Sequence, residues 1–267
     1  MSHFFASVLV VAFLGGDAAG PEIVNPRATY GHLGAPRPKG AGILPGDTAH
    51  FSFEIKNLKA DANGRVSYSI AIVISDEKGK VFFEQKPYNS FAHTYFGGNL
   101  LPAAAQVSVP LDTKASAMSW KVTVTDRTTG KSTTLNGTGK VLPADFGLVH
   151  VGTFADVEAR APIAPVGVVG SQLHLGFGVV GFDRGKDKQP AIKVQLQIRD
   201  EKGQLTSAQP LSGLVNKDIA ADVKFVPMTF GLTLDRPGRY TLELTAQDQN
   251  SGKTSTVHLP VRILPAE

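Results

Sequence analysis

The chain has 267 residues, of which 42% are hydrophobic and 19% are charged, so it holds enough apolar side chain for one or two globular cores. Its formal net charge is +4, and its positive charges are scattered over loops, as with Arg37 and Lys39. This scatter indicates a solvated surface and argues against a nucleic-acid partner. Cysteine is absent, which excludes disulfides, thiolate chemistry and cysteine-based zinc sites.

The first segment in chain order is an apolar run from Phe4 to Leu14, followed by small residues as far as Gly20. The pattern predicts a secretory signal peptide over residues 1–19, with cleavage near Ala18 or Ala19. A buried strand or short helix is the alternative. The run is shorter than the roughly 20 apolar residues that a membrane span needs, and no second run of that length follows. We therefore expect an exported protein in the periplasm, on the cell surface or outside the cell, without a membrane span in the mature chain.

The segments that follow alternate between apolar and polar residues. Residues 50–55 place Phe51, Phe53 and Ile55 on one face, and residues 67–74 and 192–199 alternate in the same way. A period of two predicts strands with one buried and one wet face, and such a face needs a second sheet to cover it. Glycine-containing turns separate the runs, and no long segment has a helical period. We expect about seven strands in each half of the chain.

The two halves of the chain repeat each other. Gly46 aligns with Gly170, and the alignment continues without a gap through an identical Asp-Glu-Lys-Gly at residues 76–79 and 200–203. Further on, we align Trp120 with Tyr240. A repeat of this length is a whole domain. We predict two homologous β-sandwich domains, residues 21–143 and 144–267, with a short proline-containing spacer that restricts hinge motion.

Two segments resemble known domains. Pro237-Gly238-Arg239-Tyr240, followed by alternating leucines, is similar to the start of strand F in bacterial immunoglobulin-like and fibronectin-III-like domains. Pro45-Gly46-Asp47 is similar to the start of their strand B. The resemblance implies an all-β fold of two tandem seven-stranded sandwiches, and a Tyr240 hydroxyl that hydrogen-bonds the backbone at a corner. It implies no particular activity. Trp120 departs from the pattern, and we expect it to pack in the core.

Motifs for chemistry are lacking. The sequence contains no G-x-S-x-G and no P-loop, so we predict no catalytic residues and no cofactor. His50 and His174 are repeat equivalents, but no histidine pair has the spacing of metal ligands, so we predict no metal site. Asp61-Ala62-Asn63-Gly64 begins like a calcium loop, yet it lacks the later glutamate, which favours an ordinary turn.

One aromatic segment stands outside the repeat. It contains Phe91, His93, Tyr95 and Phe96 and ends in two glycines. We favour packing beneath the sandwich edge as a small satellite core. The alternative is a recognition patch, since aromatic side chains supply large contact areas.

These features favour an exported, non-catalytic binding or scaffolding protein that contacts an unknown protein or envelope polymer through loops or sheet edges. Two alternatives stay open. A periplasmic pilus-type chaperone would need a long apolar strand near the end of the first domain, where residues 131–140 are polar and glycine-rich. A hydrolase would need paired carboxylates on a sandwich face, which sequence spacing does not reveal.

Overall fold

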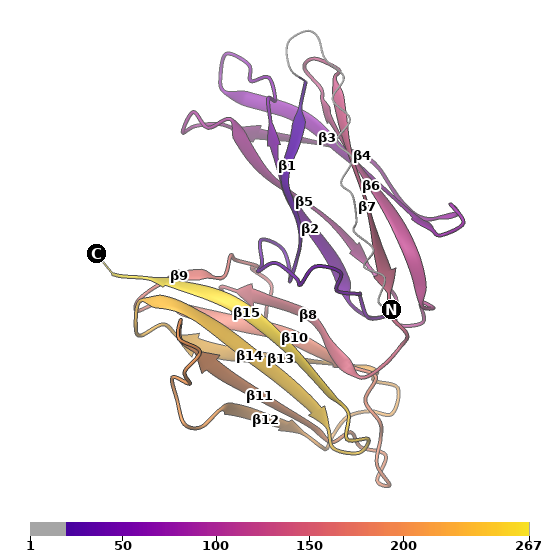
Figure 1. The fold of residues 1–267 in the computed structure, drawn as a ribbon, viewed down its shortest axis with the longest axis vertical. Coiled ribbons are helices and arrows are strands. Elements are labelled where there is room, and N and C mark those ends of the chain that lie inside the picture. Colours follow the sequence, from indigo (N-terminus) through magenta and orange to yellow (C-terminus); the bar gives the residue numbers. More distant parts are fainter. Residues whose placement is uncertain (1–19, 267) are drawn as a thin grey trace, which may run out of the picture.

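The computed structural model describes residues 20–266, and over this range it contains strands, turns and loops but no helix. The predicted signal peptide, residues 1–19, lies outside the described residues. The strands fall into an N-terminal and a C-terminal group, separated by the short spacer that follows Val141 (Figure 1). The all-β class expected from the alternating pattern is therefore confirmed.

The N-terminal half forms two sheets with an apolar core between them. The core takes Phe53 and Ile55 from one sheet and Ile72 and Val122 from the other. The first sheet has the order β1 (Glu22–Thr29), β2 (Thr48–Lys56) and β5 (Leu100–Ser108). The second has the order β4 (Val81–His93), β3 (Arg65–Asp76), β6 (Ser116–Asp126) and β7 (Ser132–Val141).

The C-terminal half is built in the same way around its own core, which includes Leu175 from one sheet and Leu196 and Leu244 from the other, each at most 1% exposed. One sheet has the order β13 (Phe225–Thr233), β10 (Gln172–Val180) and β8 (Gly147–Phe154). The other has the order β12 (Leu211–Val215), β11 (Ile192–Arg199), β14 (Gly238–Asp248), β15 (Thr254–Leu264) and β9 (Val166–Val168). Among the described residues this half thus has one strand more than the N-terminal half, the three-residue β9.

Backbone pairings recur at positions that the sequence repeat makes equivalent. Ile43 forms a parallel bridge to Val141, and Gly167 pairs in parallel with Ile263. The short β9 therefore has a one-bridge counterpart in the N-terminal half.

Buried carboxylates recur in the same manner. Asp126 accepts a hydrogen bond from the Lys59 backbone N–H at 3.1 Å, and Asp248 accepts one from the Asp183 N–H at 2.9 Å. Both carboxylates are fully buried. Each fastens the loop between the second and third long strands of its half to the end of the strand that carries it, because a buried carboxylate needs such donors.

The corner expected at Tyr240 is present near the start of strand β14. The Tyr240 hydroxyl donates to the Arg236 carbonyl oxygen at 3.3 Å and accepts from Arg236 Nε at 3.0 Å. The alignment of Trp120 with Tyr240 was wrong. Trp120 pairs with Ile74 in the register in which Leu242 pairs with Ile198, so Met118 holds the position of Tyr240. Trp120 packs against the N-terminal core, with its ring 4.3 Å from that of Phe51.

The two halves touch through the loop between β1 and β2. Figure 1 shows this loop lying against the C-terminal half. Tyr30 from the loop belongs to the C-terminal core, where it packs with residues such as Val151. Gly31 adopts a φ of 73°, and a Cβ atom there would lie 3.3 Å from the Cα of Gly152. Glycine at both positions therefore lets the two backbones approach closely.

Candidate functional site

Strand β4 exposes more large apolar side chains to solvent than any other strand of the N-terminal half. It lies at the edge of its sheet and pairs with β3 alone. The pairing register shifts at Lys86 and Pro87, because proline cannot donate a ladder hydrogen bond. Beyond this bulge the alternation resumes, and Phe91 and His93 point to the same side of the sheet, opposite Ser67 and Arg65.

The aromatic side chains beyond the bulge form a ladder that begins at Arg65. The Arg65 guanidinium lies 4.3 Å from the centre of the Phe91 ring. The Phe91 and His93 ring centres are 6.0 Å apart in an edge-to-face arrangement, and His93 stacks on Tyr95 at 5.0 Å. These four side chains are called the aromatic ladder below. Such ring pairs and cation–π contacts hold the side chains in place without burying them.

The turn that follows β4 holds the end of the ladder in position. The Thr94 backbone N–H and hydroxyl both donate to the Gly64 carbonyl oxygen, at 2.9 and 3.2 Å. Gly97 has a φ of 68° and donates its N–H to Thr94 O at 2.9 Å, which closes the turn. Tyr95 and Phe96 lie at the tip of this turn.

The expectation of a satellite core was wrong. Phe91 is 60% exposed, Tyr95 80% and Phe96 fully exposed, so these rings stand in solvent. Phe82 and Tyr88 of the same strand are also exposed, at 51% and 68%. Large apolar side chains gathered on one strand are uncommon on a surface without a partner, which makes this edge the candidate site.

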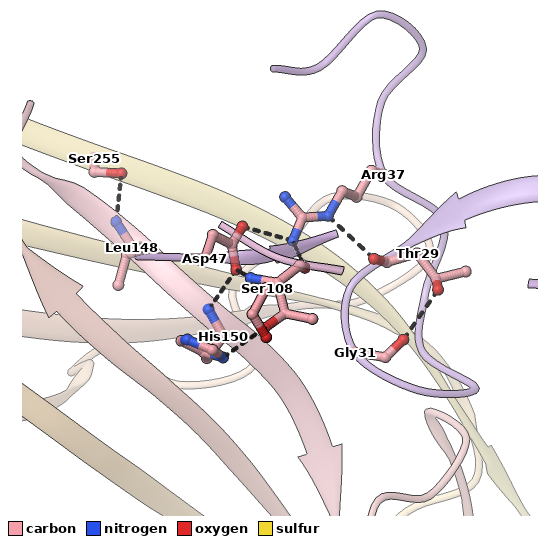
Figure 2. A network of polar contacts seen from close by, with 9 residues as sticks. Thr29, Gly31, Arg37, Asp47, Ser108, Leu148, His150 and Ser255 are labelled. Atoms are coloured by element: carbon pink, nitrogen blue, oxygen red, sulfur yellow. Dashed lines mark hydrogen bonds and ion pairs between the residues drawn. The ribbon is translucent and has the colours of Figure 1, made fainter. Parts of the chain in front are cut away.

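Apart from the aromatic ladder, a buried network of polar contacts lies between the halves (Figure 2). Asp47 Oδ2 accepts from Arg37 Nη2 at 2.7 Å, and the two side chains are 4% and 9% exposed. Asp47 Oδ1 accepts from the backbone N–H groups of Thr48 and His150, both at 2.8 Å. Because His150 lies on β8, one carboxylate ties the two halves together.

Arg37 completes the network from the β1–β2 loop. Its Nε donates to the Thr29 carbonyl oxygen at 3.1 Å, and its guanidinium lies 4.8 Å from the Tyr30 ring centre. The interpretation of Arg37 as a solvated surface charge was wrong. The sequence offered no signal for this role, since the network joins residues far apart along the chain. The buried Asp47 carboxylate accepts from Arg37 and from two backbone N–H groups, so the network holds structure together rather than presenting a reactive group.

Of the histidines near this network, His50 on β2 is partly buried and His150 on β8 is exposed. Partial burial is the main cause that lowers the pKa of His50 to about 4, and the Arg37 charge lowers it further, against an opposing effect of Asp47. His50 is therefore neutral at pH 7. Its repeat equivalent His174 shares one property: the Nδ1 atoms of both rings are buried without a hydrogen-bond partner among the described residues.

The candidate calcium loop is an ordinary turn. The Asp61 Oδ1 atom accepts from the backbone N–H groups of Asn63 and Arg65, at 2.8 and 2.9 Å. These bonds, above all the one from Arg65, lower the pKa of Asp61. Over residues 20–266, no group of three potential metal-ligating side chains was found.

A hollow of about 620 Å³ opens at one end of the C-terminal half. It forms where β12 is short: the pairing of β11 with β12 ends at Leu196, so Ile198 has a strand partner only on the β14 side. Its lining includes Leu211, Leu232, Arg236 and Tyr240, and Asp235 is its one carboxylate. A pair of carboxylates for glycoside chemistry is therefore not found in this hollow.

Comparisons with known proteins give no family. No family model matches the chain, and no curated protein matches it. Among solved structures, the C-terminal domain of the Streptococcus pyogenes antigen I/II-family protein AspA aligns with 92% of this chain and 100% of its own, at 11% identity and a TM-score of 0.29. A score this low assigns neither a shared fold nor a function. In the part of the chain that the structure describes, no helix is long and apolar enough to cross a membrane.

Proposed function

We propose that this chain is an exported, non-catalytic binding or scaffolding protein, made of two tandem immunoglobulin-like sandwiches at residues 21–143 and 144–267 after a signal peptide at residues 1–19. The strand orders support the sandwich assignment, since three- and four-stranded sheets that share one core are typical of that class. The recurring bonds to Asp126 and Asp248 support two homologous units.

The observation that carries the binding role is the exposed edge of β4. The aromatic ladder and Phe96 offer rigid aromatic surface at the end of an edge strand, where contact with a partner would cover it. The corresponding edge strand of the C-terminal half, β12, has only 5 residues and carries no aromatic side chain. The partner is a protein or an envelope polymer.

Site-specific photocrosslinking in the producing cells tests this role. A photoreactive residue at Tyr95, which is 80% exposed, should give a crosslinked product. The same residue at Leu214, which is 55% exposed on β12, is the matched control and should give none. Equal yields at both positions, or no product at Tyr95, would count against a binding edge on β4.

Export is tested on the same cells. The mature protein should be found outside the cytoplasm, and its first residue should follow Ala18 or Ala19. A cytoplasmic protein that retains its first residues would contradict the export proposal while leaving the binding role open to the crosslinking test.

A further inference from the structure

The hollow of the C-terminal half lies where the N-terminal half places a phenylalanine ring. In the N-terminal half, Phe83 on β4 pairs with Ile74, and its side chain packs against the core. The repeat makes Ser207 the equivalent of Phe83, since both stand four residues after an identical Asp-Glu-Lys-Gly turn. Ser207 lines the hollow together with Ile198, the equivalent of Ile74. The molecule itself thus shows that an aromatic ring fits this position of the fold.

The backbone supports this equivalence and shows why the position is empty. Arg199 forms an isolated bridge to Leu205, as their repeat equivalents pair on β3 and β4. Beyond this point β4 continues beside β3, whereas Ser207 forms a local turn. Its hydroxyl donates to Gln209 O at 3.0 Å and accepts from Gln209 N at 3.3 Å. The Ser207 side chain is therefore engaged in its own loop and does not replace the missing ring.

The walls of the hollow suit an aromatic group. Leu173, Leu232 and Leu242 form part of the lining and belong to the C-terminal core. Asp235 and Arg236 are the charged residues of the lining, one of each sign. A volume of about 620 Å³ lies in the range of pockets that hold drug-sized ligands, so two aromatic side chains can be accommodated.

The same chain exposes two aromatic side chains on the turn after β4. Phe96 is fully exposed and Tyr95 is 80% exposed, and these two side chains are called the aromatic tip below. The hydrogen bond from Gly97 N–H to Thr94 O holds the turn that carries them. With this much exposure, the aromatic tip does not occupy the hollow of its own chain.

The aromatic tip and the hollow each lie at the end of their half that is remote from the other half. Strand β2 begins beside the buried network, and its far end, Lys56, pairs with Leu100, which follows the turn that carries the aromatic tip. Strand β10 ends at Val180, beside Gly46 of the N-terminal half, and begins near Leu173 in the hollow. Both strands have 9 residues, so each site lies roughly 26 Å along its strand from the contact between the halves.

We propose that the aromatic tip of one molecule inserts into the hollow of a second copy, so that mature chains associate head to tail. The inference rests on the proposed binding function and names its partner. Asp61 and Arg65 lie beside the turn of the aromatic tip, and Arg236 and Asp235 line the hollow, so each surface offers the other a charge of opposite sign. The contact joins two different surfaces, and it therefore builds rings or open filaments.

The size of the contact predicts a weak association. Two aromatic side chains bury about 300–500 Å². A standard stable interface buries about 800 Å² on each partner. We therefore expect reversible association that increases with protein concentration.

Sedimentation equilibrium of the mature protein, from micromolar to millimolar concentration, tests the proposal. The average mass should rise with concentration. Tyr95→Ser with Phe96→Ser removes the aromatic tip, and Ser207→Phe fills the hollow with the residue that the N-terminal half has there. Each of these variants alone should stay monomeric. Their equimolar mixture should form a dimer and nothing larger, because the first variant keeps a hollow and the second keeps an aromatic tip.

Two further variants guard this result. Phe82→Ser, at a position 51% exposed on β4 outside the aromatic tip, is the matched control and should associate like the unchanged protein. Leu211→Asp, at a 45% exposed position of the lining, replaces Ser207→Phe if that variant does not fold, since a charge there opposes entry of a ring. An unchanged protein that stays monomeric, a variant without the aromatic tip that associates equally, or a mixture that stays monomeric would overturn the proposal.

The crosslinking experiment separates this inference from the proposed function. A product at Tyr95 with the mass of two chains supports the contact between copies. A product with a different partner, from a protein that is monomeric after purification, leaves the binding function standing and overturns the contact between copies. A monomeric protein that also gives no product at Tyr95 overturns both.

Discussion

Replacing Asp47 with alanine should destabilise the molecule far more than the loss of a surface ion pair. The substitution leaves Arg37 with a 9% exposed side chain and no carboxylate, and it removes the acceptor of the Thr48 and His150 backbone N–H groups. Breaking one side of a buried pair costs about 3–5 kcal/mol, whereas exposed pairs are worth about 0–1 kcal/mol. We expect the free energy of unfolding to fall by about 3–5 kcal/mol.

A double-mutant cycle separates the charge pair from the backbone bonds. Asp47→Asn can keep an oxygen at the Oδ1 position for both N–H groups, but it places an amide against Arg37 where Oδ2 had accepted at 2.7 Å. Arg37→Met removes the charge while filling much of the space. The double variant should be more stable than the sum of the single effects allows, with a coupling of about 1–3 kcal/mol.

Urea unfolding provides the measurement, because Trp120 is the only tryptophan and packs against the N-terminal core. Its fluorescence follows that half, and circular dichroism follows both. In the Asp47→Ala variant the two signals should separate, since the carboxylate that joins β8 to the N-terminal half is gone. A loss below about 1 kcal/mol, or strictly additive effects in the cycle, would refute the view that this pair is buried and shared.

Acidification should destabilise the protein through His50: its folded pKa of about 4 lies below the ordinary 6.5, so the unfolded chain binds more protons. The His50 contribution to the free energy of unfolding should be constant above pH 6.5 and fall by about 1–2 kcal/mol between pH 6.5 and 4. This loss is smaller than the full pKa shift implies, because His50 is partly exposed to solvent. In urea unfolding at different pH values, His50→Gln should reduce this dependence on pH. Tyr240→Phe should destabilise the protein by about 1 kcal/mol, because the hydroxyl bonds to Arg236 are lost, and this should be measured as a lower Tm. An unchanged Tm would show that these hydrogen bonds do not stabilise the fold. Asp126→Ala and Asp248→Ala should each cost about 2–4 kcal/mol in denaturant unfolding, and a large effect of one alone would contradict their equivalence.

The features predictable from the sequence were those that depend on neighbouring residues. Alternating apolar positions such as Phe51, Phe53 and Ile55 gave strands, because the side-chain period of a strand is two. The corner at Tyr240 followed from a local motif, since its bonds reach only four residues back.

The features that were missed depend on contacts between distant parts of the chain. Arg37 and Asp47 lie near each other in sequence, but Asp47 also binds the backbone N–H of His150 on β8, which is remote. Trp120 was misaligned because the two halves differ in loop length before this strand, and only strand pairing fixes the register. Exposure of Phe91 could not be read from composition, since an aromatic segment suits a core and a surface equally.

Tyr30 has a consequence for where the chain can be cut. A fragment that begins at residue 144 contains every strand from β8 onward but lacks this ring, which packs in the core of those strands. Its interior would hold an empty space the size of a phenol, and removing a large aromatic side chain from a core costs about 3–5 kcal/mol. Recombinant work on the C-terminal half should therefore supply residues 29–35 in trans as a peptide, or redesign the side chains around the gap.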